Sequence, residues 1–223
     1  GVIYFYGKDG KITNSGNIQS LPLSADKAIG MYIGVHGSGV NAGNIRLTAV
    51  GTDKDQVGVY NQSGTFSMGS GNIEVYSQNG AGLYAKAGTV NNLSGGIIKT
   101  GSGAIGLYAD NGATIQLSGT YKSVVDNGGI FALNNGSGNI NIPVGNNIVV
   151  DVEAGGMAFS STGALNTYLS SLVTGGGTLE VNLKDPTSKL AILDTPGTIL
   201  LSSLGSAYAP GATITPQVKI SSS

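Results

Sequence analysis

Ala104-Ile105-Gly106-Leu107-Tyr108-Ala109 is the clearest copy of a phrase that recurs along this chain of 223 residues. Its apolar residues alternate with glycine and tyrosine, which is the period of a β-strand rather than of a helix. The phrase returns as Gly30-Met31-Tyr32, Gly58-Val59-Tyr60, Gly82-Leu83-Tyr84 and, more weakly, Gly129-Ile130-Phe131. The steps from Gly58 to Gly82 and from Gly82 to Gly106 are each 24 residues long. A repeat of this length predicts a solenoid.

A second phrase keeps step with the first. It occurs six times, as Ser15-Gly16-Asn17-Ile18, Ala42-Gly43-Asn44-Ile45, Ser70-Gly71-Asn72-Ile73, Ser94-Gly95-Gly96-Ile97, Ser118-Gly119-Thr120-Tyr121 and Ser137-Gly138-Asn139-Ile140. In four successive copies its last residue follows the preceding repeat tyrosine by 13 positions. Turn sequences such as Asp110-Asn111-Gly112 lie between the strands, since Asn and Asp tolerate a positive φ and Gly supplies it. Short strands, sharp turns and a near-constant repeat predict an all-β chain folded as a right-handed parallel β-helix.

Alternation along the strands predicts which side chains fill the interior. One inward column is expected to contain Ile29, Met31, Val57, Val59, Leu83, Ile105 and Leu107, and a second Ile18, Ile45, Ile73, Ile97 and Ile140. The asparagines of the second phrase are expected to form a side-chain amide ladder along the axis: Asn17, Asn44, Asn72 and Asn139.

The same alternation places the repeat tyrosines on the outer face, beside the glycines Gly30, Gly58, Gly82 and Gly106. These tyrosines are the candidate binding residues of the chain: Tyr32, Tyr60, Tyr84 and Tyr108. Rigid aromatic rings that also carry a hydroxyl are well suited to contacting a partner. The alternative is a structural role, in which the rings stack on each other and shield the glycine surface, or face inward.

The last third of the chain departs from the repeat. Residues 1–145 are predicted to form regular β-helix repeats, and residues 146–223 a less regular continuation that contains one short helix. That helix is expected at 162–173, where Leu165, Tyr168, Leu169 and Leu172 have the spacing of an amphipathic helix. Strands are expected to resume at Thr178 to Leu183, Lys189 to Leu193, Thr198 to Leu204 and Thr213 to Ile220.

Composition argues against several classes of function. A net charge of −1 gives no electrostatic basis for nucleic-acid binding, and no unbroken apolar run is long enough to span a bilayer. The only arginine is Arg46, and the only histidine, His36, lies beside Gly37-Ser38-Gly39. The acidic residues are dispersed except for Asp53 with Asp55 and Asp151 with Glu153, which are expected to be solvated. We therefore predict no catalytic residues, no metal site and no cofactor.

The sequence from Gly82 to Ala85, like that from Gly106 to Ala109, is followed by a turn and then by Ser-Gly-Gly-Ile or a related phrase. This pattern resembles the passenger repeats of the very large fusobacterial autotransporter adhesins, the RadD-like outer membrane proteins, over residues 1 to about 142. The resemblance implies a type V secreted passenger on the bacterial cell surface, with its outer-membrane anchor in a C-terminal barrel outside this segment. It also implies coaggregation with other bacteria and virulence-related attachment to host cells, through surface proteins or glycans.

Two classes of function remain open. The first is a non-enzymatic adhesin segment. The second is a carbohydrate-active β-helix enzyme, a lyase or hydrolase, which would require two carboxylates to converge beside a Lys or Arg. A stalk that self-associates through polar ladders is a third possibility.

Overall fold

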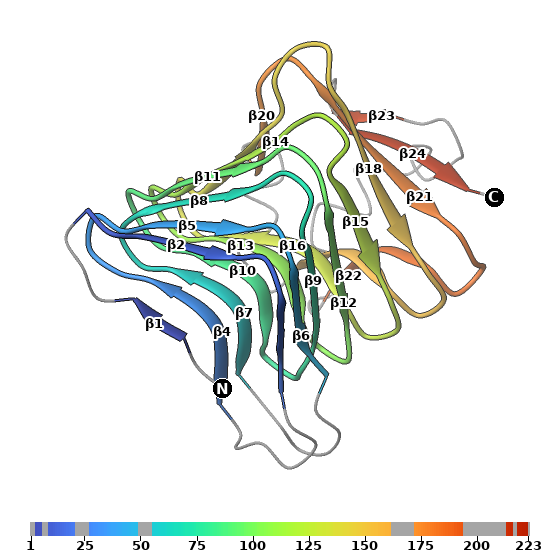
Figure 1. Ribbon diagram of the computed structural model, residues 1–223. Coiled ribbons are helices and arrows are strands. Elements are labelled where there is room, and N and C mark those ends of the chain that lie inside the picture. The colour runs from blue at the N-terminus through green and yellow to red at the C-terminus, as the bar shows by residue number, and fades with distance from the viewer. Residues whose placement is uncertain are drawn as a thin grey trace.

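Three sheets form the three sides of a β-helix in the computed structural model (Figure 1). The structure describes residues 3–5, 9–20, 27–48, 55–161, 172–193, 213–215 and 218–222. Every described strand pairing is parallel except that between the two strands nearest the C-terminus. The parallel β-helix predicted from the repeats is therefore confirmed.

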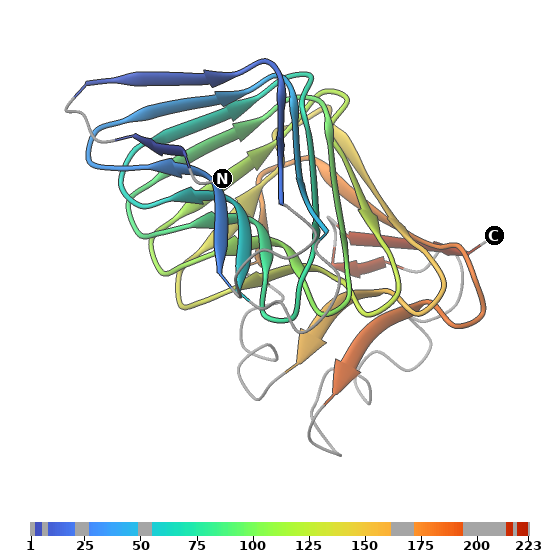
Figure 2. The ribbon, with the colours of Figure 1, turned by 60° about the horizontal axis from the view of Figure 1, so that its bottom comes forward.

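Up to residue 193, each sheet takes one strand from each coil in chain order, and the two strands nearest the C-terminus extend the third sheet at its C-terminal end. Sheet A consists of β1 (Ile3–Phe5), β4 (Ala28–Ile33), β7 (Gln56–Asn61), β10 (Ala81–Ala85), β13 (Ile105–Ala109), β16 (Ile130–Asn134), β19 (Met157–Ser161) and β22 (Lys189–Leu193). Sheet B consists of β2 (Lys11–Asn14), β5 (Ser38–Asn41), β8 (Thr65–Met68), β11 (Val90–Leu93), β14 (Thr114–Leu117), β17 (Asn139–Asn141) and β20 (Val173–Thr174). Sheet C consists of β3 (Asn17–Gln19), β6 (Asn44–Leu47), β9 (Asn72–Tyr76), β12 (Ile97–Gly101), β15 (Lys122–Val125), β18 (Asn147–Val152), β21 (Thr178–Leu183), β24 (Val218–Ser222) and β23 (Thr213–Thr215). Figure 2 shows the coils lying on one another from the blue N-terminal end toward the orange C-terminal end.

The core is a continuous apolar interior that all three sheets enclose. Its largest fully buried side chains include Phe66, Phe131, Phe159, Met31, Leu83 and Ile73. Like residues stack on like along it, as Leu83 does on Val59 and Leu107 in the neighbouring coils. Each coil buries its apolar face only against its neighbours, so the coils depend on one another for stability.

The glycines of the first phrase face the core, which corrects the expectation that they lie outside beside the tyrosines. A Cβ on Gly58 would lie 2.5 Å from Ile73 Cγ2, and one on Gly82 would lie 2.6 Å from Ile98 Cγ2. The isoleucines of sheet C therefore occupy the space that a side chain on sheet A would need. As a consequence, three residues predicted to be inward are half-buried and outside the core cluster: Ile29, Val57 and Ile105.

The prediction of a second inward column is confirmed for Ile18, Ile45 and Ile73 and is wrong for its last two members, Ile97 and Ile140. Ile98 pairs with Ile73, whereas Ile97 pairs with Asn72 and is 39% exposed. The segment before Ile98 is one residue longer than its counterpart before Ile73, and the extra residue lies between β10 and β11, because Ala85 pairs with Asn61 but Val90 pairs with Thr65. Ile140 is buried, but it lies in sheet B, where it pairs with Ile115.

A buried tyrosine compensates for a small residue in the next coil. Ser123 pairs with Ile98 and leaves the space of an isoleucine unfilled, and the ring of Tyr121 lies in the core there. The Tyr121 hydroxyl is hydrogen-bonded to Ser123 Oγ at 2.6 Å, which satisfies both buried groups. Burial raises the pKa of Tyr121 strongly, so this phenol remains neutral.

The solenoid continues beyond residue 146, where β18, β19, β20, β21 and β22 extend the three sheets. The predicted strands Thr178–Leu183 and Lys189–Leu193 are present with those bounds as β21 and β22. Most of the helix predicted at 162–173 lies outside the described residues, as does the strand predicted at 198–204. Val173, the last residue of that predicted helix, begins β20.

Candidate functional site

The four candidate tyrosines form one continuous column on the outer face of sheet A. Their ring centroids are 5.4 Å apart between Tyr32 and Tyr60, 5.2 Å between Tyr60 and Tyr84, and 4.6 Å between Tyr84 and Tyr108. The ring planes are within 23° of parallel in each pair. All four side chains are half-buried, so the column presents ring edges rather than ring faces to solvent. We call it the tyrosine column.

An ion pair flanks the tyrosine column at its third and fourth rings. Lys86 Nζ lies 2.9 Å from Asp110 Oδ2 and 5.6 Å from the centroid of Tyr84. The hydrogen bond from Lys86 holds the pKa of Asp110 below its usual value. Partial burial raises the pKa values of Tyr84 and Tyr108, so both hydroxyls stay protonated at neutral pH.

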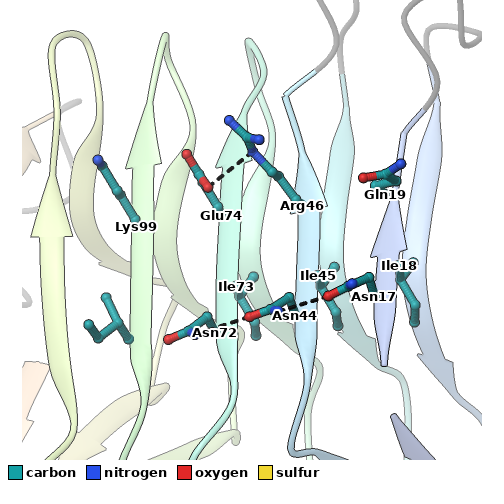
Figure 3. A pocket seen from close by; sticks show the side chains of 11 residues that line it. Asn17, Ile18, Gln19, Asn44, Ile45, Arg46, Asn72, Ile73, Glu74 and Lys99 are labelled. Atoms are coloured by element: carbon teal, nitrogen blue, oxygen red, sulfur yellow. Dashed lines mark hydrogen bonds and ion pairs between the residues drawn. The ribbon is translucent and has the colours of Figure 1, made fainter. Parts of the chain in front are cut away.

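A second ordered surface lies on the outer face of sheet C, where the predicted amide ladder is present for three of its four members (Figure 3). Asn44 Nδ2 donates to Asn17 Oδ1 at 2.8 Å, and Asn72 Nδ2 donates to Asn44 Oδ1 at 3.1 Å. The prediction is wrong for Asn139, which lies in sheet B and accepts a hydrogen bond from Thr174 Oγ1. In the coil after Asn72, the exposed Ile97 takes the ladder position.

Two residues further along each strand, a row of longer side chains runs parallel to the ladder. Strand pairing aligns its members across β3, β6, β9 and β12: Gln19, Arg46, Glu74 and Lys99. Arg46 Nε lies 3.3 Å from Glu74 Oε2. Between the two rows lie Ile18, Ile45 and Ile73, whose side chains are buried, so the floor between the rows is backbone. The result is a trough of about 500 Å³, which we call the amide groove.

A cluster of charged and aromatic groups lies next to the amide groove. The ring of Tyr76 covers Gly101, and its hydroxyl donates to the carboxylate of Asp126, two coils away. Lys99 Nζ lies 3.3 Å from Asp126 Oδ2. Burial, with the hydrogen bond to Asp126 next in size, raises the pKa of Tyr76 far above its usual value. Asp126 and Glu153 line one cavity of about 540 Å³ together with Lys99.

Within the part of the chain that the structure describes, the remaining acidic residues and the histidine are not grouped into a site. Asp53 lies outside the described residues, and Asp55 is exposed with a φ of 58°. Asp151 was expected to be solvated, but it is buried, forms an ion pair with Lys122 and accepts a hydrogen bond from Asn182. His36 is exposed in a turn with a φ of 55°.

Sequence reasoning missed the amide groove and the Tyr76 cluster. The signal for the groove was present, because Gln19, Arg46 and Glu74 each follow a predicted ladder asparagine by two residues. The contact from Tyr76 to Asp126 spans 50 residues, and no local pattern predicts it.

Comparison with known proteins identifies no relative: no family model, no curated protein and no solved structure matches this chain. The described part of the chain contains no group of three or more His, Cys, Asp or Glu side chains that could hold a metal ion. No helix within the described ranges is both long enough and apolar enough to cross a membrane.

Proposed function

We propose that this chain is a segment of a bacterial cell-surface passenger that acts in adhesion and coaggregation by non-enzymatic binding. The observation that carries the proposal is the tyrosine column, which extends across four coils on one outer face. Stacking fixes the ring orientations before a partner arrives, so binding costs little side-chain entropy. The partners on this proposal are surface proteins or glycans of host cells or of other bacteria.

The repeat pattern supports the same proposal. The glycine-aliphatic-tyrosine phrase and the phrase that follows it resemble fusobacterial type V autotransporter adhesins, the RadD-like outer membrane proteins. On that resemblance the segment is extracellular and belongs to a protein held at the outer membrane. A parallel β-helix suits this role, because added coils lengthen the rod and repeat its outer surface.

Cell binding by the purified chain, measured by flow cytometry on partner bacteria and host cells, tests the proposal. Tyr84→Ala removes the central contact of the tyrosine column and is expected to lower cell binding while the circular dichroism spectrum stays that of a β-solenoid. Asn92→Ala, on the outer face of sheet B, is the control because Asn92 is exposed and remote from the column. Full binding by a folded Tyr84→Ala protein would leave the tyrosine column a purely structural feature.

A carbohydrate-active enzyme is the second candidate, and one observation favours it. Asp126 and Glu153 line one cavity beside Lys99, which is the convergence of carboxylates and a base that such an enzyme requires. Asp126, however, already accepts a hydrogen bond from Tyr76 and pairs with Lys99, so it is poorly placed to accept a proton. Appearance of shortened products on incubation with uronic-acid and neutral polysaccharides, abolished by Glu153→Gln, would establish this candidate instead.

A further inference from the structure

The amide groove has the form of a site for an extended ligand. It crosses strands β3, β6, β9 and β12 along the axis of the solenoid, and equivalent groups recur in successive coils about every 4.8 Å. Its two rows of side chains are two residues apart on each strand, or about 7 Å. Figure 3 shows the ladder amides on one side and the longer charged side chains on the other. A ligand lying there meets a side chain from each row at every coil, with amides at the first three ladder positions.

The groups that line the amide groove keep unused hydrogen-bonding capacity. A primary amide has two donors and two acceptor positions, and the ladder uses one of each at the central Asn44. The ion pair of Arg46 is made through Nε, and its terminal nitrogens make no hydrogen bond to any described residue. The Arg46 side chain is 62% exposed and that of Lys99 is 42% exposed, so both reach solvent.

Charge and backbone pairing narrow the class of ligand. Two cations, Arg46 and Lys99, flank the single carboxylate of Glu74 in the aligned row. Lys99 also pairs with Asp126, so the exposed guanidinium of Arg46 is the cation that a ligand in the groove can contact. An extended peptide would seek unpaired backbone groups at a sheet edge. The strands under the amide groove are paired on both sides at β6 and β9, so the groove offers side chains rather than backbone. A chain rich in hydroxyls and carboxylates fits these groups better than a peptide does.

We propose that the amide groove binds a linear oligosaccharide of uronate units. The coil spacing is close to the length of one pyranose unit in an extended chain, so successive sugars would meet successive coils. The ladder amides would bond the hydroxyls, and the guanidinium of Arg46 would pair with a carboxylate, a contact that its planar donors favour. This site is separate from the tyrosine column and goes beyond the function proposed for that column.

Titration calorimetry with two matched probes tests the inference: β-1,4-linked hexamannuronate and β-1,4-linked mannohexaose, which share linkage and stereochemistry and differ in the carboxylates. We expect hexamannuronate to bind more tightly than mannohexaose. Arg46→Gln and Asn44→Ala should each weaken hexamannuronate at least fivefold, whereas Glu74→Gln, which removes the negative charge, should tighten it. Asn92→Ala is the control and should bind as the unaltered protein does.

Three results would overturn the inference: no binding of hexamannuronate, equal affinity for the neutral probe, or an affinity insensitive to Arg46→Gln in a folded protein. Because Arg46, Asn44 and Glu74 are on the surface, their variants are expected to fold, and circular dichroism checks this. Tyr84→Ala should leave hexamannuronate binding unchanged. Loss of cell binding in Tyr84→Ala and loss of sugar binding in Arg46→Gln thus report separately on the tyrosine column and on the amide groove.

Discussion

Gly101 should tolerate alanine only when the ring of Tyr76 is absent. A Cβ on Gly101 would lie 2.4 Å from Tyr76 Cε1 and 2.6 Å from Cδ1, which is closer than any real contact. The ring cannot simply slide away, because its hydroxyl is held at the far end by the carboxylate of Asp126. Gly101→Ala should therefore displace the whole ring and break that hydrogen bond.

The magnitude follows from two opposing effects. Losing a hydrogen bond to a charged group costs about 1.5–3 kcal/mol, and overpacking adds about 1–3 kcal/mol. Replacing glycine by alanine stabilises the fold by about 0.4–1 kcal/mol through the unfolded chain, and the φ of Gly101 is outside the left-handed region. We expect Gly101→Ala to lower the free energy of unfolding by about 2–4 kcal/mol in the otherwise unaltered protein.

The same substitution should reverse its sign in a Tyr76→Ala background. The nearest remaining neighbour of the new Cβ is then Asp126 Cβ at 3.3 Å, a tight contact that a small shift relieves. We expect Gly101→Ala to be neutral or to stabilise by up to about 1 kcal/mol there. The coupling energy of the double-mutant cycle should then be about 2–5 kcal/mol.

Urea denaturation followed by circular dichroism measures the four proteins of the cycle, with Tyr76→Phe as the matched control. Phenylalanine keeps the ring and loses the hydroxyl, so Gly101→Ala in that background should still cost the steric part. An equal cost of Gly101→Ala with and without the ring would show that Tyr76 does not lie over Gly101, and would refute the reasoning.

Three further predictions concern the core and the ion pairs. Ile98→Asp should cost several kcal/mol of stability or prevent folding by burying an unpaired charge, whereas Ile97→Asp should change stability by only about 0.5 kcal/mol. Thermal denaturation measures both variants, and a lower melting temperature for Ile97→Asp than for Ile98→Asp would show that the strand register is wrong. Gln56→Met should raise the free energy of unfolding by about 1 kcal/mol, because neither amide atom of this buried side chain has a hydrogen-bond partner among the described residues; a lower urea midpoint would contradict this. The hydrogen bond from Lys86 lowers the pKa of Asp110 in the folded protein, so the pair stabilises the fold above the ordinary carboxyl pKa, and this stabilisation is lost as the pH falls through the lowered pKa. Between pH 7 and pH 3 the free energy of unfolding of Lys86→Met should therefore fall by less than that of the unaltered protein. Equal falls in the two proteins would count against a stabilising role for the pair.

The strands and their order were predictable because each sequence repeat corresponds to one coil of the solenoid. Tyr60, Tyr84 and Tyr108 recur at one interval, and the structure stacks them at ring-contact distances. A parallel β-helix is the simplest way for a repeat of about 24 residues to bring like residues together.

Which side chains face the core was less predictable, because one extra residue in a turn exchanges the inward and outward positions of the strand that follows, relative to the spacing of the repeat. The extra residue between β10 and β11 moves Ile98 into the core and Ile97 to the surface, although Ile97 has the constant spacing in the sequence. The fixed interval of 13 residues was therefore a correct sign of the repeat but a wrong guide to burial in the fourth copy. Side-chain volume explains which isoleucine is buried, because Gly82 leaves a space in the core that Ile98 Cγ2 fills.

Buried polar groups were also beyond the sequence patterns. Asn14 Nδ2 donates to Asn41 Oδ1 at 2.8 Å, and Asn61 Nδ2 donates to Asn91 Oδ1 at 2.9 Å, inside the solenoid. Their side chains also bond backbone carbonyls near the turns, which offsets the cost of burying an amide. The exposed asparagines of the ladder and these buried ones look alike in the sequence, and only strand register separates them.

The inward and outward faces of each strand are constrained differently, and this difference explains where a binding site can form in this fold. Inward rows are fixed by their neighbours, because a change at Ile73 or Leu83 is felt in the coils on both sides. Outward rows carry no such constraint, and the row from Gln19 to Lys99 changes from amide to cation to anion to cation over four coils without disturbing the strands beneath it. An outer row can therefore acquire a binding sequence one coil at a time while the coil geometry sets the spacing. For that reason the tyrosine column and the amide groove can serve different partners on one scaffold.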